Sequence, residues 1–169
     1  MEKTFGAQER HDQLIVYGKG QKAVLIYGYG EEDGQGYDWR QVFTHRPTKQ
    51  EVLQTITDHI NSLTDQKVLS GFIWKDNDGV ERKVWLNDEN QRNFSEAHRI
   101  AVMLGAKKYE PATFKISEDE NKNAKYRTFE TLSDLNDFYL SAFAYIKQTL
   151  AEGWIEKDAV AVWVESLEL

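Results

Sequence analysis

The chain has 169 residues, of which 40% are hydrophobic and 29% charged, as in a folded protein with one domain, or one domain and a small appendage. It has no cysteine, which excludes disulfides, thiolate metal sites and cysteine nucleophiles. The formal net charge of −7 argues against duplex DNA or an anionic membrane as the main partner, because clustered lysines and arginines bind phosphates.

The N-terminal residues 1–13 are polar and are expected to be loose. They contain no apolar core segment, so we expect no signal peptide, and no apolar run approaches the roughly 20 residues of a membrane span. The apolar runs at 14–17 and 23–27 flank a glycine-rich turn at 18–21, and this pattern predicts a β-hairpin.

Residues 28–36, GYGEEDGQG, predict a mobile acidic loop, with contact to a partner as the alternative, since binding residues often lie on loops. The segment is not a dinucleotide-binding fingerprint, because Asp33 stands where the third glycine is needed and three consecutive carboxylates would repel a pyrophosphate. After it, apolar and polar side chains alternate over 37–44 and predict a third strand.

Capping residues predict where the first two helices begin. The TKQE sequence at 48–51 fits a capping box, and the apolar spacing that follows predicts a helix ending near Asp65. A first strand of the next hairpin is then expected from Val68 onward. Asn87 or Asp88 caps a second helix, which ends at a glycine, residue 105.

The third helix is expected to be the longest and to begin at Thr131 or Ser133. Its continuation over 154–163 is open, because AVAVWVE also alternates like a strand and Gly153 weakens the helix. The apolar stripe predicted for this helix is unusually wide. It consists of Leu135, Phe138, Tyr139, Ala142, Tyr145, Ile146 and Leu150, with Phe143 at one side.

The sequence DNDG at 76–79 has two possible interpretations, a calcium loop or the turn of a hairpin. A calcium loop with Gly79 at its sixth position puts Trp74 at the first and Trp85 at the twelfth, and tryptophan has no oxygen ligand to offer. A three-residue turn with Gly79 in the left-handed conformation instead places Trp74 opposite Arg82. It also keeps Phe72, Trp74, Val80 and Val84 on one face, which is expected to face the core. The turn is therefore preferred.

Two stretches repeat the order of a hairpin followed by a capped helix. The first runs from Phe72 to Phe94, and the second from Phe114 to Phe138, with an acidic turn in each. A shared ββα unit and a chance similarity are both open.

The predicted fold class is α+β, with antiparallel hairpins each followed by a helix and three main helices packed on antiparallel sheet. Residues 1–47 are expected to form an N-terminal β-hairpin or meander module, and residues 48–169 an α+β domain. Whether the module packs on that domain is open.

No catalytic or metal-binding signature is present. The histidines His11, His45, His59 and His98 lack the spacing of metal ligands, so partly exposed structural imidazoles are expected. There is no P-loop and no nucleophile elbow. We therefore expect no catalytic residue, no metal site and no cofactor.

Residues 48–162 resemble a domain family encoded by phages and prophages, including those of Bacteroides-type bacteria, often near tail-fibre and tail-assembly genes. The matching residues are short motifs, and most of them are structural. They are Ser70-Gly71-Phe72, Val84-Trp85-Leu86 before Glu89-Asn90-Gln91, and Gly153 with Lys157-Asp158-Ala159. The resemblance implies no catalytic residue, and it implies a location in the host cytoplasm during assembly or in the virion.

The resemblance and the missing catalytic spacing together predict a non-enzymatic structural or protein-interaction protein, tail-associated. One alternative is an accessory domain that binds a carbohydrate or small molecule through Trp39 and the 28–36 loop, and another is an enzyme with an unrecognised site. The expected partners are other phage chains or further copies of this chain, as a homo-oligomer, with neither duplex nucleic acid nor membrane. The candidate interface residues are Tyr139, Phe143, Trp154, Trp163 and Trp39.

Overall fold

The computed structural model describes residues 1–18 and 22–169, so most of the turn expected at 18–21 lies outside the described residues. The chain forms two compact units, one made of residues 1–62 with 153–169 and the other of residues 63–152. Both combine antiparallel strands with helices, which confirms the α+β class. Residues 1–47 form the sheet of the first unit, and their status as a separate module stays a prediction.

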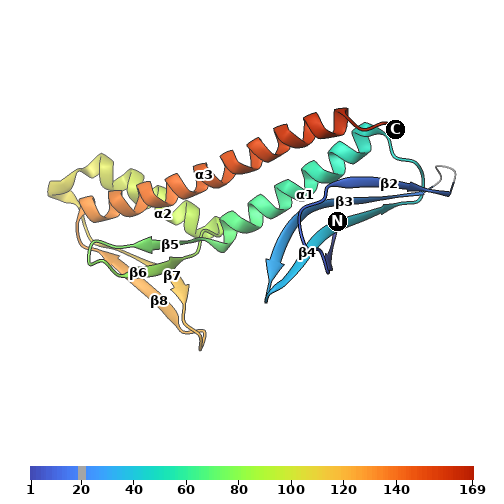
Figure 1. The fold of residues 1–169 in the computed structure, drawn as a ribbon. Helices are drawn as coiled ribbons and strands as arrows, with labels where there is room; N and C mark the ends of the chain where they lie inside the picture. The colour runs from blue at the N-terminus through green and yellow to red at the C-terminus, as the bar shows by residue number, and fades with distance from the viewer. Residues whose placement is uncertain (19–21) are drawn as a thin grey trace. The chain divides into compact units, whose positions relative to one another are not determined.

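The first unit is built on a four-stranded antiparallel sheet in the order β1-β4-β3-β2 (Figure 1). Its strands are β1 (Glu2–Phe5), β2 (Gln13–Tyr17), β3 (Lys22–Glu32) and β4 (Gln35–Phe43). The predicted hairpin and third strand are confirmed, but the expectation that all of residues 1–13 are loose is wrong. Strand β1 pairs with β4, where the Lys3 ammonium lies 4.2 Å from the ring centroid of Tyr37.

The glycine-rich segment 28–36 is not the mobile loop that the sequence predicts. Strand β3 continues to Glu32 and β4 begins at Gln35, so that only two residues turn the chain. Asp33 and Gly34 both have positive φ, 51° and 75°, as a two-residue Asp-Gly hairpin turn requires. The other glycines permit close packing within the strands, since a Cβ on Gly30 would overlap the Tyr37 ring.

Parts of two helices cover one face of this sheet (Figure 1). They come from α1 (Lys49–Ser70) and α3 (Leu132–Glu165). The predicted capping box is present at the start of α1, where the backbone N–H of Glu51 donates to Thr48 Oγ1 at 3.2 Å and Thr48 N–H donates to Glu51 Oε2 at 2.7 Å. The core beneath consists of Leu25, Tyr27, Val52, Ile56, Ile60, Val160 and Val164.

Helix α1 ends at Ser70, and the expected end near Asp65 and strand from Val68 are wrong. The stop is Gly71, whose φ of 75° is the left-handed conformation that commonly ends a helix. Its N–H donates to the carbonyl of Val68 at 2.9 Å. The residues between 65 and 71 are compatible with a helix, so the glycine, and not the aspartate, is the physical end signal.

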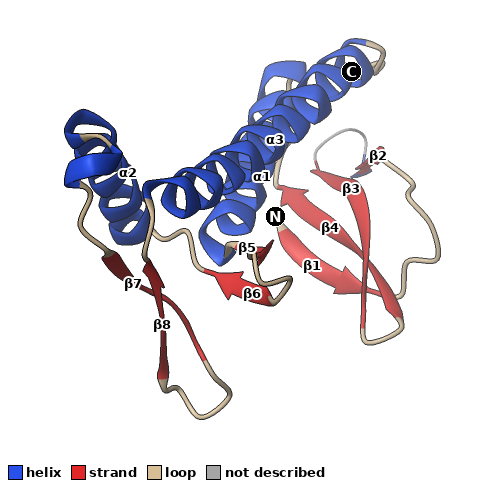
Figure 2. Cartoon of the chain, turned by 90° about the vertical axis from the view of Figure 1, so that its left-hand side faces the viewer, coloured by secondary structure: helices blue, strands red, loops and turns tan. Residues whose placement is uncertain are grey.

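The second unit contains two β-hairpins and two helices, which pack around one hydrophobic core (Figure 2). Its further elements are β5 (Phe72–Lys75), β6 (Glu81–Val84), α2 (Asp88–Leu104), β7 (Ala112–Glu118) and β8 (Ala124–Phe129). The hairpins meet where the Trp85 N–H donates to the Ile116 carbonyl at 2.8 Å. In the core, the Phe138 ring lies 4.9 Å from Phe94 and 5.0 Å from Trp74.

The turn interpretation of DNDG is confirmed. Phe72 pairs with Val84 and Trp74 with Arg82, and Gly79 has φ of 77°. Val80, expected on the core face, is exposed at the end of the turn.

Asp76 anchors this turn from a side chain that solvent does not reach. Its Oδ1 accepts hydrogen bonds from the N–H groups of Asp78 and Val80, and its Oδ2 accepts from Arg82 Nε at 2.5 Å. Burial alone raises the pKa of this carboxyl, but the hydrogen bonds from Arg82 and the Val80 N–H outweigh burial and hold the pKa below its usual value.

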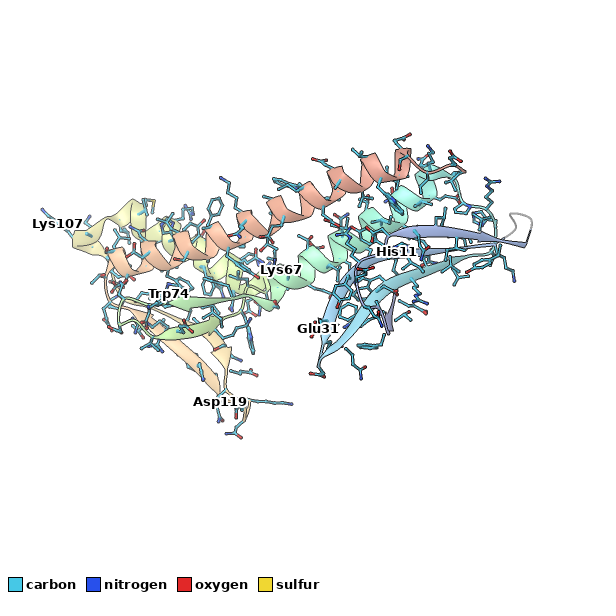
Figure 3. The ribbon with its side chains drawn as sticks, in the orientation of Figure 1. His11, Glu31, Lys67, Trp74, Lys107 and Asp119 are labelled. Atoms are coloured by element: carbon cyan, nitrogen blue, oxygen red, sulfur yellow. The ribbon has the colours of Figure 1, made fainter. Side chains whose placement is uncertain are left out.

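The two hairpins of the second unit have the same turn. Asp119 at the tip of β7–β8 accepts from the N–H groups two and four residues later, as Asp76 does (Figure 3). Three residues after each aspartate comes a residue with positive φ, Gly79 at 77° and Lys122 at 62°. Each of the helices that follow is capped by a side chain that accepts the N–H three residues later, Asn87 before α2 and Thr131 before α3. These matching contacts favour a shared ββα unit over a chance similarity.

The matched turns predict that substitutions at equivalent positions, 79 and 122, change the free energy of unfolding in opposite directions. Gly79→Val should cost roughly 1–2 kcal/mol of unfolding free energy, because a β-branched residue resists positive φ. Lys122→Gly should instead stabilise by up to about 1 kcal/mol, since glycine removes the strain that lysine bears there. Urea denaturation of both variants is the measurement, and a loss of stability in Lys122→Gly would contradict the assignment.

Helix α3 is continuous from Leu132 to Glu165, so residues 154–163 are helical and not a strand. Val160 and Val164 are buried and lie one turn apart, while Val162 between them is exposed. The alternating AVAVWVE sequence therefore fits a helix with one buried side, which carries Val160 and Val164, and one exposed side, which carries Val162. Thr131, and not Ser133, caps α3, because its hydroxyl accepts the N–H of Asp134 at 3.1 Å.

Candidate interaction surfaces

The second unit has a groove of about 630 Å³ between α2 and α3. Phe94 and Ala142, which are buried core residues, form its floor. The walls and rim also contain Leu86, Gln91, Arg92, Ser95, Glu96, Tyr139, Phe143 and Ile146. Apolar side chains thus make most of the groove, and its polar groups come from α2.

Aromatic stacking builds one wall of this groove. The imidazole of His98 lies parallel to the Tyr139 ring at a centroid distance of 4.0 Å. Phe143, one turn further along α3, is nearly parallel to Tyr139 at 6.5 Å and is exposed. The exposed Phe143 ring is thus held beside a stacked pair.

The polar groups on the rim differ in how far their hydrogen-bonding capacity is already used. Gln91 Nε2 donates to the Leu86 carbonyl at 2.5 Å, and Glu96 receives two hydrogen bonds from Arg99 at 2.6 and 3.0 Å. Arg92 forms no ion pair with any carboxylate of the described residues. The rim therefore has one uncompensated positive charge.

In the first unit, the C-terminal part of α3 exposes three large apolar side chains. Trp154, Ile155 and Val162 are 57%, 70% and 75% exposed. Residues 155 and 162 are seven positions apart, which returns a helix to nearly the same face after two turns. We call these three side chains the α3 stripe.

The five predicted interface residues do not form one surface. Tyr139 and Phe143 line the groove, Trp154 belongs to the α3 stripe, and Trp163 is half-buried against the core of the first unit. Trp39 is half-buried on β4, with its ring 4.5 Å from His59 and 5.7 Å from Tyr37.

Sequence reasoning missed three residues of these surfaces, namely Arg92, Ile155 and Val162. The seven-residue spacing of Ile155 and Val162 was a usable signal, but the strand-like alternation competed with it. Nothing in the sequence around Arg92 distinguishes it from other arginines on helix surfaces.

A polar network in the first unit joins the N-terminal segment to β3 and α3. Arg10 donates to Glu156 Oε1 at 2.6 Å and to Asp12 at 2.9 Å, and the Tyr27 hydroxyl also donates to Glu156. Burial raises the pKa of Glu156, but hydrogen bonds from Arg10 and Tyr27 outweigh it and hold the pKa below its usual value. Asp12 also accepts the Gly28 N–H at 2.7 Å, so the network fixes a segment expected to be loose.

His59 is the buried titratable group of α1. Its side chain packs on Trp39, and its Nε2 has no hydrogen-bond partner among the described residues. Burial, with a smaller contribution from the positive N-terminus, lowers the pKa of His59 to about 4. The imidazole is therefore neutral at pH 7 and packs as an apolar ring.

No protein-family model, curated protein or solved structure matches this chain. Among residues 1–18 and 22–169, no three histidine, aspartate or glutamate side chains are grouped so that they could hold a metal ion. No helix in the described part of the chain has the length and apolar character needed to cross a membrane. The α2–α3 groove and the α3 stripe are the two candidate interaction surfaces of the described residues.

Proposed function

We propose that this protein is a non-enzymatic structural or protein-interaction component of a phage or prophage tail, and that its chains associate through the α3 stripe. The observation that carries the association is the exposure of Trp154, Ile155 and Val162 on one helix segment. The phage and tail assignment is supported by the sequence resemblance of residues 48–162.

Burial of the α3 stripe supplies the energy for association. A fully buried large apolar side chain contributes about 1.5–3 kcal/mol relative to an exposed one, and a twofold dimer buries each member of the stripe twice. Ala159, which is also exposed, lies between the larger members and leaves room for a second helix to approach. A second copy of the same stripe is thus a suitable partner.

Sedimentation equilibrium over a concentration series tests this association. The wild-type chain should dimerise in the micromolar range, and Ile155→Lys with Val162→Lys should weaken dimerisation at least tenfold, because each lysine would have to lose its hydration at the interface. Val42→Lys is the matched control, since Val42 is 61% exposed in the same unit but lies on β4.

Three results would contradict the proposal: a wild-type monomer at high micromolar concentration, a stripe variant that dimerises like the wild type, or equal weakening by Val42→Lys. Circular dichroism of the variants shows whether they remain folded. The phage assignment has its own test, which is mass spectrometry of particles purified after prophage induction. Absence of this chain from the particles and from their assembly intermediates would overturn that part.

The carbohydrate-binding and enzymatic alternatives stay predictions without a specific observation in their favour. The predicted carbohydrate or small-molecule site combined Trp39 with the 28–36 loop. Trp39 instead packs against His59 and Tyr37, and residues 28–36 belong to two paired strands and a tight turn.

A further inference from the structure

The α2–α3 groove of the second unit has the size and lining of a small-molecule site. Such sites measure about 300–1,000 Å³ and combine mostly apolar walls with a few polar groups that orient the ligand. This groove has about 630 Å³ and contains six apolar or aromatic lining residues, against four polar ones. A ligand with a largely apolar body therefore fits its interior.

The polar side of the groove selects for negative charge. Arg99 neutralises Glu96, and Gln91 is occupied by the Leu86 carbonyl, which leaves Arg92 and the Ser95 hydroxyl as unused donors. An arginine forms two parallel hydrogen bonds with a carboxylate, which adds direction to the charge attraction.

We propose that the α2–α3 groove binds a free straight-chain fatty acid, with its hydrocarbon chain against Phe94, Ala142 and Ile146 and its carboxylate on Arg92. The charge of Arg92 matches the single anionic group, and the apolar floor matches the unbranched chain. This site lies in a different unit from the α3 stripe and does not depend on association through it.

Isothermal titration calorimetry with hexanoate, octanoate and decanoate, each below its micelle concentration, tests the apolar part. Each buried methylene contributes about 0.8 kcal/mol, so two further carbons should tighten Kd about tenfold until the groove is filled. Affinity that does not change with chain length, or an absence of binding at millimolar decanoate, would overturn the proposal.

The charge is tested by comparing decanoate with decanol for the wild-type chain and for Arg92→Gln. The variant should bind decanoate about tenfold more weakly and decanol unchanged, because only the carboxylate uses the guanidinium. Lys107→Gln is the matched control: it removes a positive charge from the same unit, but Lys107 does not line the groove and should change neither affinity (Figure 3).

A third variant, Ala142→Phe, should abolish binding of both ligands by filling the floor of the groove. Because this variant introduces a large side chain beside the core, Phe143→Ser on the exposed wall is a second test and should weaken both ligands several-fold. Equal affinity of the wild type for decanoate and decanol would overturn the carboxylate contact. Dimerisation of the wild type that is lost in Phe143→Ser and in Arg92→Gln would overturn the fatty acid in favour of a second chain as the occupant.

Discussion

Replacing Gly71 by alanine should destabilise the second unit by roughly 3 kcal/mol or more, the largest effect expected for a single methyl group in this protein. Gly71 has φ of 75°, and an added Cβ would lie 1.7 Å from the Val84 carbonyl oxygen and 2.7 Å from its carbonyl carbon. Both are backbone atoms of the β5–β6 hairpin, so the overlap is relieved only if the hairpin moves from the end of α1.

Gly105→Ala is the matched control for this change. Gly105 ends α2 with φ of 73°, almost the same as that of Gly71, but an added Cβ meets no atom within 4 Å. Its replacement should therefore cost only the backbone strain, roughly 1–3 kcal/mol, because φ of 73° with ψ of 165° is a conformation that residues other than glycine rarely adopt. Urea denaturation of both variants separates strain from overlap, and equal losses in the two would show that the contact with Val84 is unimportant.

Acidification should reveal the second large effect, which comes from His59. Below pH 6.5 the unfolded chain binds a proton at this imidazole, whereas the native state binds it only near its depressed pKa of about 4. Stability is therefore lost as the pH falls from 6.5 towards 4, because the unfolded state binds more protons. The loss from this one group should be about 2 kcal/mol at pH 4.5.

The measurement compares urea denaturation of the wild type and His59→Phe between pH 7 and 4.5. Phenylalanine keeps a ring against Trp39 but does not titrate, so the wild type should lose about 2 kcal/mol more than the variant over this range. His11→Gln is the control, since it also removes an imidazole, but one that is exposed to solvent. Parallel curves for the wild type and His59→Phe would show that His59 is not buried as a neutral group.

Sequence reasoning succeeded where the decisive atoms lie within a few residues of each other. The register of the β5–β6 hairpin follows from Gly79 and the three-residue turn, and the caps at Asn87 and Thr131 follow from side chains that accept nearby N–H groups. The same reasoning failed at Asp33-Gly34, where an Asp-Gly turn signal was present but the surrounding glycines suggested a loop.

The candidate surfaces were only partly predictable, because apolar spacing shows which side chains could be buried and not which ones are covered. Tyr139 and Phe143 were expected at an interface, and both line the groove. Trp163 was also predicted to be an interface residue, yet it packs against the core of the first unit. Val162, the residue before it, is exposed. Such differences depend on which neighbours the folded chain supplies.

The sequence by itself determined the fold class, the starts of the helices and the turn at 76–79, because capping, periodicity and turn conformation are local properties. Only the tertiary structure decided the contacts between distant segments. Examples are the pairing of β1 with β4, the hydrogen bond between Arg10 and Glu156, and the groove where α2 meets α3. These contacts depend on packing among residues far apart in the chain, and no local pattern specifies which distant segment will supply the partner.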